Sequence, residues 1–257
     1  PSCNKHHRIS PRQRFDIVFG KNNYEILKTP IPQDDPLNWS DAKPYKDRLK
    51  IARKKTGMDC GMMVVNAYLK NIKITAIASD FDFVGGSIGA AEGEAFLYGI
   101  QQAIENKQPF IIFTSGGGMR MMESLISLSQ MTRTTLAINE LKKNNLPYIV
   151  CLTDPTAGGI TASYAMLGDI HLAEPGALIA FAGARVIQGT VREELPEGFQ
   201  KSEYVEKTGF VDLIVERKDL NEKISTLLSI LLKQNSTINS NIDETSEDSR
   251  AIAKTAS

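Results

Sequence analysis

The chain has 257 residues, 42% of them hydrophobic, and its 30 basic side chains balance 30 acidic ones to give a formal net charge of +0. This length predicts one large domain, or one domain with an appended segment, and the charge balance argues against a protein that coats polyanions. No apolar run reaches the roughly 18 residues of a membrane span, so we expect a cytoplasmic protein. The cysteines, Cys3, Cys60 and Cys151, are too few for a secreted disulfide scaffold.

Residues 1–60 are predicted to form a polar N-terminal segment, in which Pro30, Pro32, Pro36 and Pro44 interrupt regular structure. A basic run compatible with a helix lies near its end: Lys43, Lys46, Arg48, Lys50, Arg53, Lys54 and Lys55. A globular domain is predicted over residues 61–233, and it opens with a hairpin of two strands, Met62–Leu69 and Ile72–Ser79. Residues 234–257 are polar with few large apolar side chains, and we expect them to be disordered.

Within the domain, an order of apolar strand, glycine pair and helix recurs. The strands are Phe83–Val84, Phe110–Thr114 and Tyr148–Leu152; the glycines are Gly85–Gly86, Gly116–Gly118 and Gly158–Gly159; the helices run over 90–106, up to 144, and over Thr161–Leu167. This alternation predicts an α/β fold with a mostly parallel sheet covered by helices. The second helix carries an apolar stripe at near-helical spacing: Met121, Leu125, Leu128, Met131, Ile138 and Leu141. Further strands are predicted at Ile170–Ala173, Leu178–Phe181 and Val211–Val215, and a closing amphipathic helix at Leu220–Leu232.

The glycine pairs between strand ends and helix starts are the most informative feature for function. Glycine lets the backbone turn sharply and lets a ligand approach the main-chain amides. The first N–H groups of the following helix have no internal partner and lie at the positive end of the helix dipole. Such a corner therefore binds phosphates or stabilises a developing oxyanion. The alternative is that each pair only makes a tight turn. Three pairs in comparable positions favour at least one oxyanion site.

Side chains suited to acid–base catalysis are scarce. The only histidines are His6, His7 and His171, and the chain contains neither a GxSxG elbow nor a G-x-x-x-x-G-K-[ST] phosphate loop. His171 lies in a short strand, which favours a hydrogen-bonded core histidine over a triad with Ser163 and Asp169. The sequence therefore indicates a catalyst that works through backbone amides.

Seven longer strings carry a family resemblance: Phe83–Gly89, Gly116–Glu123, Leu152–Gly159, Ala173–Pro175, Phe181–Ile187, Thr190–Arg192 and Leu195–Gln200. In this order, over about residues 4–233, they resemble the β subunits of bacterial and plastid-type acetyl-CoA carboxylase carboxyltransferase. The resemblance implies the crotonase-like (ClpP/crotonase) fold of repeated β-β-α units. It also implies an enzyme that moves a carboxyl group from carboxybiotin to acetyl-CoA, giving malonyl-CoA for fatty acid synthesis.

The resemblance further implies partners and site residues. Biotin is expected on a separate biotin carboxyl carrier protein, and a carboxyltransferase α subunit is expected to complete the site in an α2β2 assembly, so that this chain alone is inactive. By correspondence, Gly158 and Gly159 form the catalytic amide pair. The other glycines, Gly85, Gly86, Gly117 and Gly118, are expected to shape the pocket for CoA. Arg120 is expected to bind CoA or to form a structural ion pair, and the basic run to attract CoA phosphates or to be a solvated helix face.

Two departures from the family pattern concern the second turn and the N-terminus. The family's Ser-Gly-Gly-Ala-Arg turn aligns with Gly116–Arg120, so that Gly116 replaces the serine and Met119 replaces the alanine. Pro1–His7 resembles the end of a four-cysteine zinc ribbon, of which only Cys3 is present. Zinc of this kind takes four ligands, so Cys3 is a metal ligand only if the other ribbon cysteines lie upstream, which we expect.

Two other functions stay open at this point. Another crotonase-fold acyl-CoA enzyme, a hydratase or a decarboxylase, would need carboxylates in its pocket, for which Glu92, Glu94 and Glu123 are the candidates. A nucleic-acid-binding protein would use the zinc ribbon and the basic run, although the zero net charge and the lack of aromatic residues within that run count against it.

Overall fold

A single mixed sheet organises the chain in this computed structural model, which describes residues 6–192 and 194–233. The strand order is β1-β2-β3-β4-β5-β6-β8, and β7 pairs with β5. The bounds are β1 (Tyr24–Leu27), β2 (Met62–Leu69), β3 (Ile72–Ser79), β4 (Phe110–Gly116), β5 (Tyr148–Ala157), β6 (Ile170–Ala173), β7 (Ile179–Ala180) and β8 (Leu213–Ile214). The first three strands pair antiparallel, and all pairs from β3 onward are parallel, as predicted.

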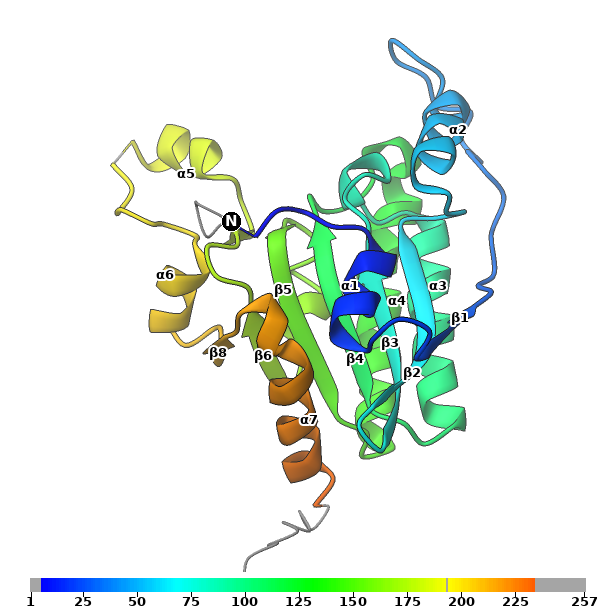
Figure 1. Cartoon of the computed structure of the whole chain (residues 1–257). Coiled ribbons are helices and arrows are strands. Elements are labelled where there is room, and N and C mark those ends of the chain that lie inside the picture. The colour runs from blue at the N-terminus through cyan, green and yellow to red at the C-terminus, as the bar shows by residue number, and fades with distance from the viewer. Residues whose placement is uncertain (1–5, 193, 234–257) are drawn as a thin grey trace, which may run out of the picture.

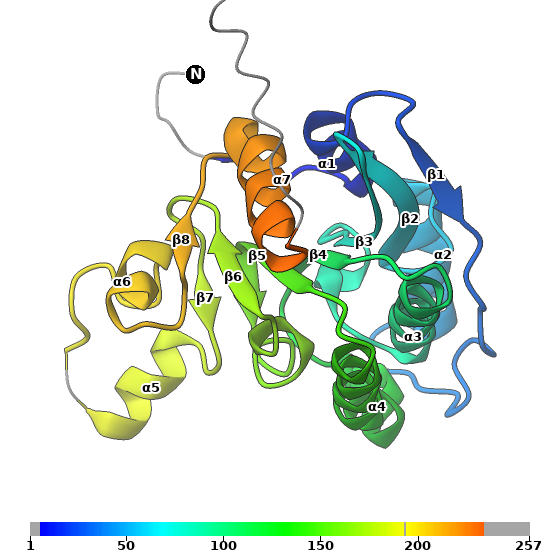
Figure 2. The ribbon, with the colours of Figure 1, turned by 90° about the horizontal axis from the view of Figure 1, so that it is seen from below.

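Helices cover both faces of the sheet (Figures 1 and 2). The helices are α1 (Pro11–Val18), α2 (Tyr45–Thr56), α3 (Ala90–Glu105), α4 (Ser124–Lys143), α5 (Ala184–Val191), α6 (Ser202–Lys207) and α7 (Leu220–Leu231). Single 3-10 turns are η1 (Val84–Gly86), η2 (Met121–Glu123), η3 (Tyr164–Met166) and η4 (Arg217–Asp219). Figure 2 shows α3 and α4 against one face, and α1 and α7 against the other. No helix in the described part of the chain is long and apolar enough to cross a bilayer.

The side-chain alternation of β4 builds two cores, one on each face of the sheet. Phe110 points into the core with α3, where its ring centroid lies 5.6 Å from that of Phe96. Phe113, three residues further along the strand, belongs to the core with α1, where its ring centroid lies 6.4 Å from that of Phe15. Because successive side chains of a strand point to opposite faces, this apolar run is buried on both sides. The carboxyl ends of the parallel strands are thereby held on a rigid layer.

The N-terminal segment is part of the same fold. Phe15 of α1 and Tyr45 of α2 are fully buried, and β1 pairs with β2. A division at residue 60 therefore does not separate two cores, because α1 packs on the sheet and α2 packs against Phe83 and Met122 of the domain. The sequence signal for α1 was a capping box, in which Ser10 and Gln13 bond each other's backbone around Pro11. Cys3 and residues 234–257 lie outside the described residues.

The helix predicted after the third glycine pair is wrong. The helix expected over Thr161–Leu167 is only the turn η3, because Ser163 has non-helical dihedral angles (φ −137°, ψ −120°). The Thr161 and Ser163 hydroxyls donate to the carbonyls of Gly158 and Gly159, and such local bonds compete with helix formation. The strand predicted at Phe83–Val84 is also wrong, because Val84 belongs to the turn η1 and the preceding strand is β3. The prediction also omitted α1, β1, α5 and α6.

The apolar stripe predicted for α4 is buried only in its second half. Ile138 and Leu141 are buried, but Leu125 is 74% exposed and Leu128 52% exposed. In the first half of α4, the buried face is polar and consists of Ser127, Gln130 and Thr134. The reason is the close approach of α3: a Cβ atom on Gly93 would collide with the Gln130 side chain. Gln130 therefore fills the space that an apolar residue was expected to fill.

Candidate functional site

The three glycine corners meet at one edge of the sheet. They follow β3, β4 and β5, which are parallel neighbours, so the carboxyl ends of these strands lie together. The first two corners touch through their backbones: a Cβ atom on Gly86 would lie 2.7 Å from the Gly116 Cα atom, and one on Gly116 would collide with the Gly86 carbonyl oxygen. Only glycine fits at these two positions.

The second and third corners also touch. A Cβ atom on Gly158 would lie 2.9 Å from the Gly117 carbonyl oxygen, and one on Gly118 would lie 3.3 Å from the Gly159 nitrogen. Gly118 and Gly158 have positive φ angles of 125° and 64°, which side chains rarely adopt. Three corners that are far apart in the sequence thus form one continuous surface of main-chain atoms.

The hydrogen bonds of this surface show which amides are available. The Gly158 N–H donates to the carbonyls of Ala180 (3.0 Å) and Phe181 (3.1 Å). The Gly158 member of the predicted Gly158–Gly159 donor pair is therefore already bonded within this chain. The Gly159 N–H, and that of Gly118 beside it, donate to no acceptor among the described residues.

Two of the four glycines predicted to shape the pocket also have bonded amides. The Gly86 N–H donates to the Phe83 carbonyl (2.9 Å), and the Gly117 N–H donates to the Gly85 carbonyl (3.1 Å). Gly85 and Gly86 lie in the turn η1 with φ angles of 67° and 64°. Among the six predicted glycines, Gly85, Gly118 and Gly159 have N–H groups without an acceptor in the described part of the chain, and Gly118 is itself buried.

An apolar cavity opens beside the third corner. It has a volume of about 440 Å³, and its lining includes Thr161, Ala180 and Phe181, the last two being the residues that accept the Gly158 N–H. Gly158 and Gly159 are themselves half-buried. The corner is therefore neither sealed under packed side chains nor open to bulk water on all sides.

Met119, which replaces the family's alanine, covers the Gly159 corner. A Cβ atom on Gly159 would lie 2.7 Å from the Met119 Cγ atom and 3.3 Å from the Met131 Sδ atom. Both methionine side chains are partly exposed, so they form a flexible apolar boundary beside Gly159. The sequence analysis noted Met119 as a departure but did not anticipate Met131 at this corner.

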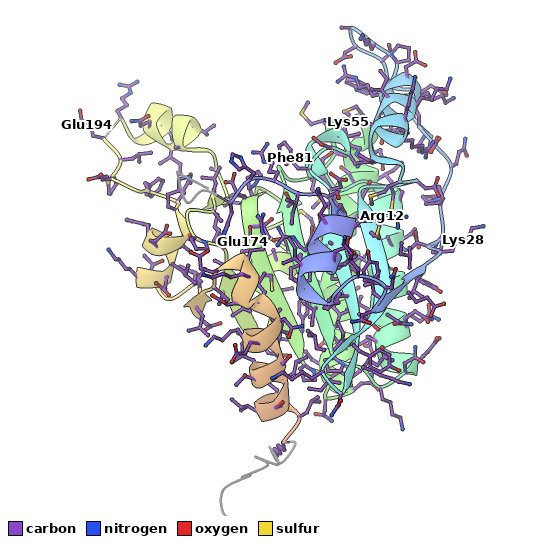
Figure 3. The ribbon with its side chains drawn as sticks, in the orientation of Figure 1. Arg12, Lys28, Lys55, Phe81, Glu174 and Glu194 are labelled. Carbon is purple, nitrogen blue, oxygen red and sulfur yellow. The ribbon has the colours of Figure 1, made fainter. Side chains whose placement is uncertain are left out.

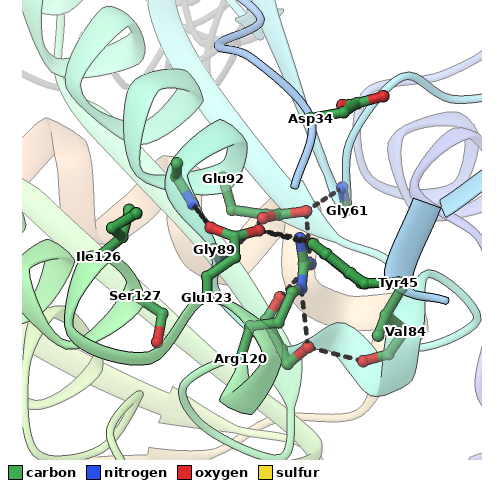
Figure 4. Close-up of polar contacts among 12 residues, drawn as sticks. Asp34, Tyr45, Gly61, Val84, Gly89, Glu92, Arg120, Glu123, Ile126 and Ser127 are labelled. Carbon is green, nitrogen blue, oxygen red and sulfur yellow. Dashed lines mark hydrogen bonds and ion pairs between the residues drawn. The ribbon is translucent and has the colours of Figure 1, made fainter. Parts of the chain in front are cut away.

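Arg120 does not reach the surface of the corner, so its predicted contact with CoA is corrected to the structural alternative. Its guanidinium is 1% exposed and forms ion pairs with Glu92 (2.7 Å) and Glu123 (3.4 Å), as Figure 4 shows. It also donates to the Ser87 carbonyl (2.6 Å) and to the Tyr45 hydroxyl (3.1 Å). Burial lowers the pKa of Arg120, but the Glu92 carboxylate and the other partners outweigh it, so this pKa lies above its ordinary value.

None of the three candidate glutamates is free for acid–base work. Glu92 accepts the N–H groups of Gly61 (2.8 Å) and Gly89 (2.9 Å) in addition to Arg120. Glu123 accepts the Ala90 N–H (2.6 Å) and the Tyr45 hydroxyl (2.5 Å). Glu94 forms a surface ion pair with Arg133 (2.7 Å). These carboxylates hold loops and helix starts in place.

His171, Ser163 and Asp169 do not form a triad. The His171 Nε2 atom accepts the Gly168 N–H (3.2 Å), which matches the predicted core histidine. The Ser163 hydroxyl donates to the Gly159 carbonyl (2.6 Å), and the Asp169 carboxylate accepts the Tyr148 N–H (2.8 Å). Burial lowers the pKa of His171, which keeps the imidazole neutral.

Six of the seven residues of the basic run lie on α2, with Lys43 just before it, and four of the seven charges are paired. Arg48, Lys50, Arg53 and Lys55 form ion pairs with Asp41, Asp47, Asp34 and Asp82, respectively. This pairing favours the solvated helix face over a site that collects phosphates.

The cysteines and histidines within the described residues do not form a metal site. Cys60 and Cys151 are buried, and burial raises the pKa of the Cys60 thiol to about 12. His6 Nε2 lies 2.9 Å from the Glu216 carboxylate. No group of three or more His, Cys, Asp or Glu side chains in residues 6–192 and 194–233 is arranged to hold a metal ion. The described residues therefore do not fit a zinc ribbon.

Comparisons with known proteins agree in sequence and in fold. The family described as carboxyl transferase domain matches residues 44–255. The acetyl-coenzyme A carboxylase carboxyl transferase subunit beta of Pelagibacter ubique (strain HTCC1062) is 90% identical over 257 residues, which cover 100% of this chain and 83% of that protein.

Two solved structures with the same fold are more distant in sequence. Transcarboxylase 12S with methylmalonyl-coenzyme A bound has a TM-score of 0.69 at 20% identity and covers 86% of this chain and 41% of its own. The Pseudomonas malonate decarboxylase MdcD-MdcE hetero-dimer has a TM-score of 0.64 at 20% identity. The match covers 88% of this chain and 86% of that one. The predicted crotonase-like fold is confirmed.

Proposed function

This chain belongs to the acetyl-CoA carboxylase carboxyl transferase beta subunits, a family of carboxyltransferases, and from this premise we propose how its glycine corner takes part in the transfer. The acceptor is acetyl-CoA and the product is malonyl-CoA, the building block of fatty acid synthesis. When bound, carboxybiotin on a separate carrier protein supplies the carboxyl group and, once that group has left, a ureido nitrogen that takes the proton. What this chain's own residues do is position the acyl thioester and stabilise its charge.

The single observation that carries the proposal is the Gly159 N–H, which donates to no acceptor among the described residues and lies two residues before Thr161 in the cavity lining. An acetyl thioester that loses a proton places negative charge on its carbonyl oxygen. Main-chain N–H groups that are already oriented toward that oxygen stabilise the charge without reorganisation. The Gly159 N–H is such a donor, and the Gly118 N–H, on the loop packed against it, is the second candidate in this chain.

The engaged side chains support transfer over hydration. A hydratase needs a carboxylate that faces the substrate, whereas Glu92 and Glu123 are sealed in the network around Arg120. The malonate decarboxylase fold is shared, so the fold alone does not separate a decarboxylase from a carboxyltransferase. The paired charges on α2 also do not favour a nucleic-acid-binding function.

We further propose that this chain holds half of the active site. A carboxyltransferase α subunit supplies the matching donors, in an assembly of two α and two β chains, and the biotin carboxyl carrier protein delivers its cofactor to the joint site. Exposed apolar side chains close to the corner are consistent with a partner: Phe181 is 70% exposed, and Met121 78%.

The test is malonyl-CoA formation by the complex of this chain with an α-type subunit. A Gly159→Pro variant loses the donor N–H, and Gly159→Ala keeps it; both are made in a Met119→Ala background, because the Met119 side chain would otherwise collide with either new side chain. We expect the proline variant to be at least about a hundredfold slower than the alanine variant, the usual cost of one oxyanion donor.

Two results would contradict the proposal. Equal rates of the proline and alanine variants would show that the Gly159 amide does not bind the developing charge. Full activity of this chain without an α subunit would show that it is not half of a shared site. Circular dichroism of each variant checks that the fold is retained.

A further inference from the structure

One member of the network around Arg120 comes from outside the strand–glycine units. Tyr45 is the first residue of α2, in the polar N-terminal segment, and it is fully buried. Its hydroxyl donates to Glu123 Oε1 (2.5 Å) and accepts from Arg120 Nη1 (3.1 Å) (Figure 4). Burial raises the pKa of Tyr45, so the hydroxyl keeps its proton and remains a donor.

The two partners of Tyr45 hold the segments that frame the first two glycine corners. The second oxygen of Glu123 accepts the Ala90 N–H at the start of α3. Arg120 Nη2 donates to the Ser87 carbonyl, just after Gly85–Gly86, and to Glu92. The hydroxyl of Tyr45 therefore joins α2 to two residues of one turn, Arg120 and Glu123, which are 75 and 78 residues further along the chain.

A continuous set of main-chain bonds leads from this network to the donor amide. The Arg120 N–H donates to the Ile88 carbonyl (2.9 Å), and the Ile88 N–H donates to the Gly118 carbonyl (2.9 Å). Gly118 lies beside the third corner, because a Cβ atom on Gly118 would be 3.3 Å from the Gly159 nitrogen. The main chain of Arg120 is thus tied by two hydrogen bonds to the loop that lies beside Gly159.

We propose that Tyr45 is a positioning residue for carboxyl transfer, which acts through Glu123 and Arg120 to hold the Gly118 loop against the Gly159 amide. The inference rests on the proposed function of Gly159. Without the hydroxyl, the buried Glu123 carboxylate loses one of its donors and moves toward the remaining ones, which draws Arg120 with it. A donor that is misplaced by about 1 Å loses much of its effect on the transition state, about a hundredfold in the worst case.

The test replaces Tyr45 by phenylalanine in the complex with the α subunit. We expect kcat to fall about tenfold, while KM for acetyl-CoA stays within about twofold, because the displaced amide binds charge that develops only in the transition state. Amide hydrogen exchange, followed by mass spectrometry, supplies a readout that does not depend on activity. Peptides that contain residues 117–120 and 157–160 are expected to exchange faster in Tyr45→Phe.

Tyr148→Phe is the matched control. Tyr148 is equally buried, and its hydroxyl donates one hydrogen bond, to the Tyr164 carbonyl (3.0 Å). It lies at the first residue of β5, whereas the glycine corner follows the last residue of that strand. This variant is expected to lose a comparable amount of stability but to keep the wild-type kcat and the wild-type exchange at residues 117–120.

Each outcome is decisive. An unchanged kcat in Tyr45→Phe, unchanged exchange at residues 117–120, or an equal fall of kcat in Tyr148→Phe would overturn the inference while the wild-type complex remains active. An inactive wild-type complex would instead refute the proposed function, and the inference with it.

Discussion

Glycine at neighbouring strand ends allows the backbone of one loop to lie directly on the backbone of the next. At Gly86 and Gly116 no side chain has room, since a Cβ atom on either residue would collide with the main chain of the other loop. At Gly85 the surroundings are open, and only the positive φ of 67° favours glycine. The same residue type therefore serves two physical purposes in one turn.

This distinction gives a prediction at the residue scale. Gly86→Ala is expected to destabilise the protein by about 3 kcal/mol or more, because both the left-handed backbone and the clash with main-chain atoms must be relieved. Gly57→Ala is the control: it has the same kind of backbone angle (φ 67°) but nothing within 4 Å of the added atom, so only about 1 kcal/mol is expected. Urea unfolding measures both, and equal losses would contradict the assignment.

The glycine corners were predicted from the sequence, and their contact with one another follows from the parallel order of the strands. The state of each amide was not predictable. The Gly158 N–H is occupied by carbonyls of residues 180 and 181, and nothing in the residues around Gly158 indicates that β7 returns to this point. Of the two N–H groups in the predicted Gly158–Gly159 pair, only that of Gly159 has no acceptor among the described residues.

Helix α4 shows what periodicity cannot decide at the scale of an element. Its apolar residues recur at helical spacing along the whole length, but Leu125 and Leu128 face away from the core, whereas Ile138 faces into it. The difference arises because α3 approaches the first half of α4 at Gly93, where Gln130 fills the interface.

The two halves of α4 are expected to respond differently to truncation. Leu125→Ala combined with Leu128→Ala should change the free energy of unfolding of this chain by no more than about 0.5 kcal/mol per residue, as is usual for exposed positions. Ile138→Ala, which leaves a cavity in the core, should cost about 2–4 kcal/mol. Chemical unfolding of the separate chain measures each value. A large loss in the double variant would show that the first half of the stripe is buried in solution.

At the scale of the whole molecule, one buried carboxylate ties the two ends of the fold together. Glu174, at the end of β6 (Figure 3), accepts hydrogen bonds from Arg14 of α1 (2.7 Å) and from Arg217 of η4 (2.8 Å). Arg217 also donates to the His7 carbonyl (3.0 Å). Burial raises the pKa of Glu174, but the hydrogen bonds from Arg217 and the charge of Arg14 outweigh it and lower the pKa to about 2.

This ion pair network predicts a pH dependence of stability. The Glu174 carboxylate takes up a proton near pH 4.5 in the unfolded chain but only near pH 2 in the folded one. The unfolded state thus binds more protons in between, and the contribution of Glu174 to stability is present above about pH 4.5 and is lost as the pH falls toward 2.

Urea unfolding at a series of pH values tests this expectation. The wild-type free energy of unfolding should fall across this range, and Glu174→Gln should show a shallower fall from a lower value at neutral pH, since it leaves two arginines without their carboxylate. Glu140→Gln, an exposed control that pairs only with Lys143, should follow the wild-type slope. Identical slopes in wild type and Glu174→Gln would assign the acid sensitivity to other groups.

By itself, the sequence determined the opening hairpin, the strands before the second and third glycine corners, the long helices and the family, because these depend on residues that are adjacent in the chain. Only the tertiary structure decided that the Gly159 amide is unbonded and the Gly158 amide is not, that Arg120 is sealed away from ligands, and that Tyr45 reaches the site. These properties are set by contacts across tens of residues, where a hydrogen bond or a buried charge depends on which atoms the fold brings within about 3 Å.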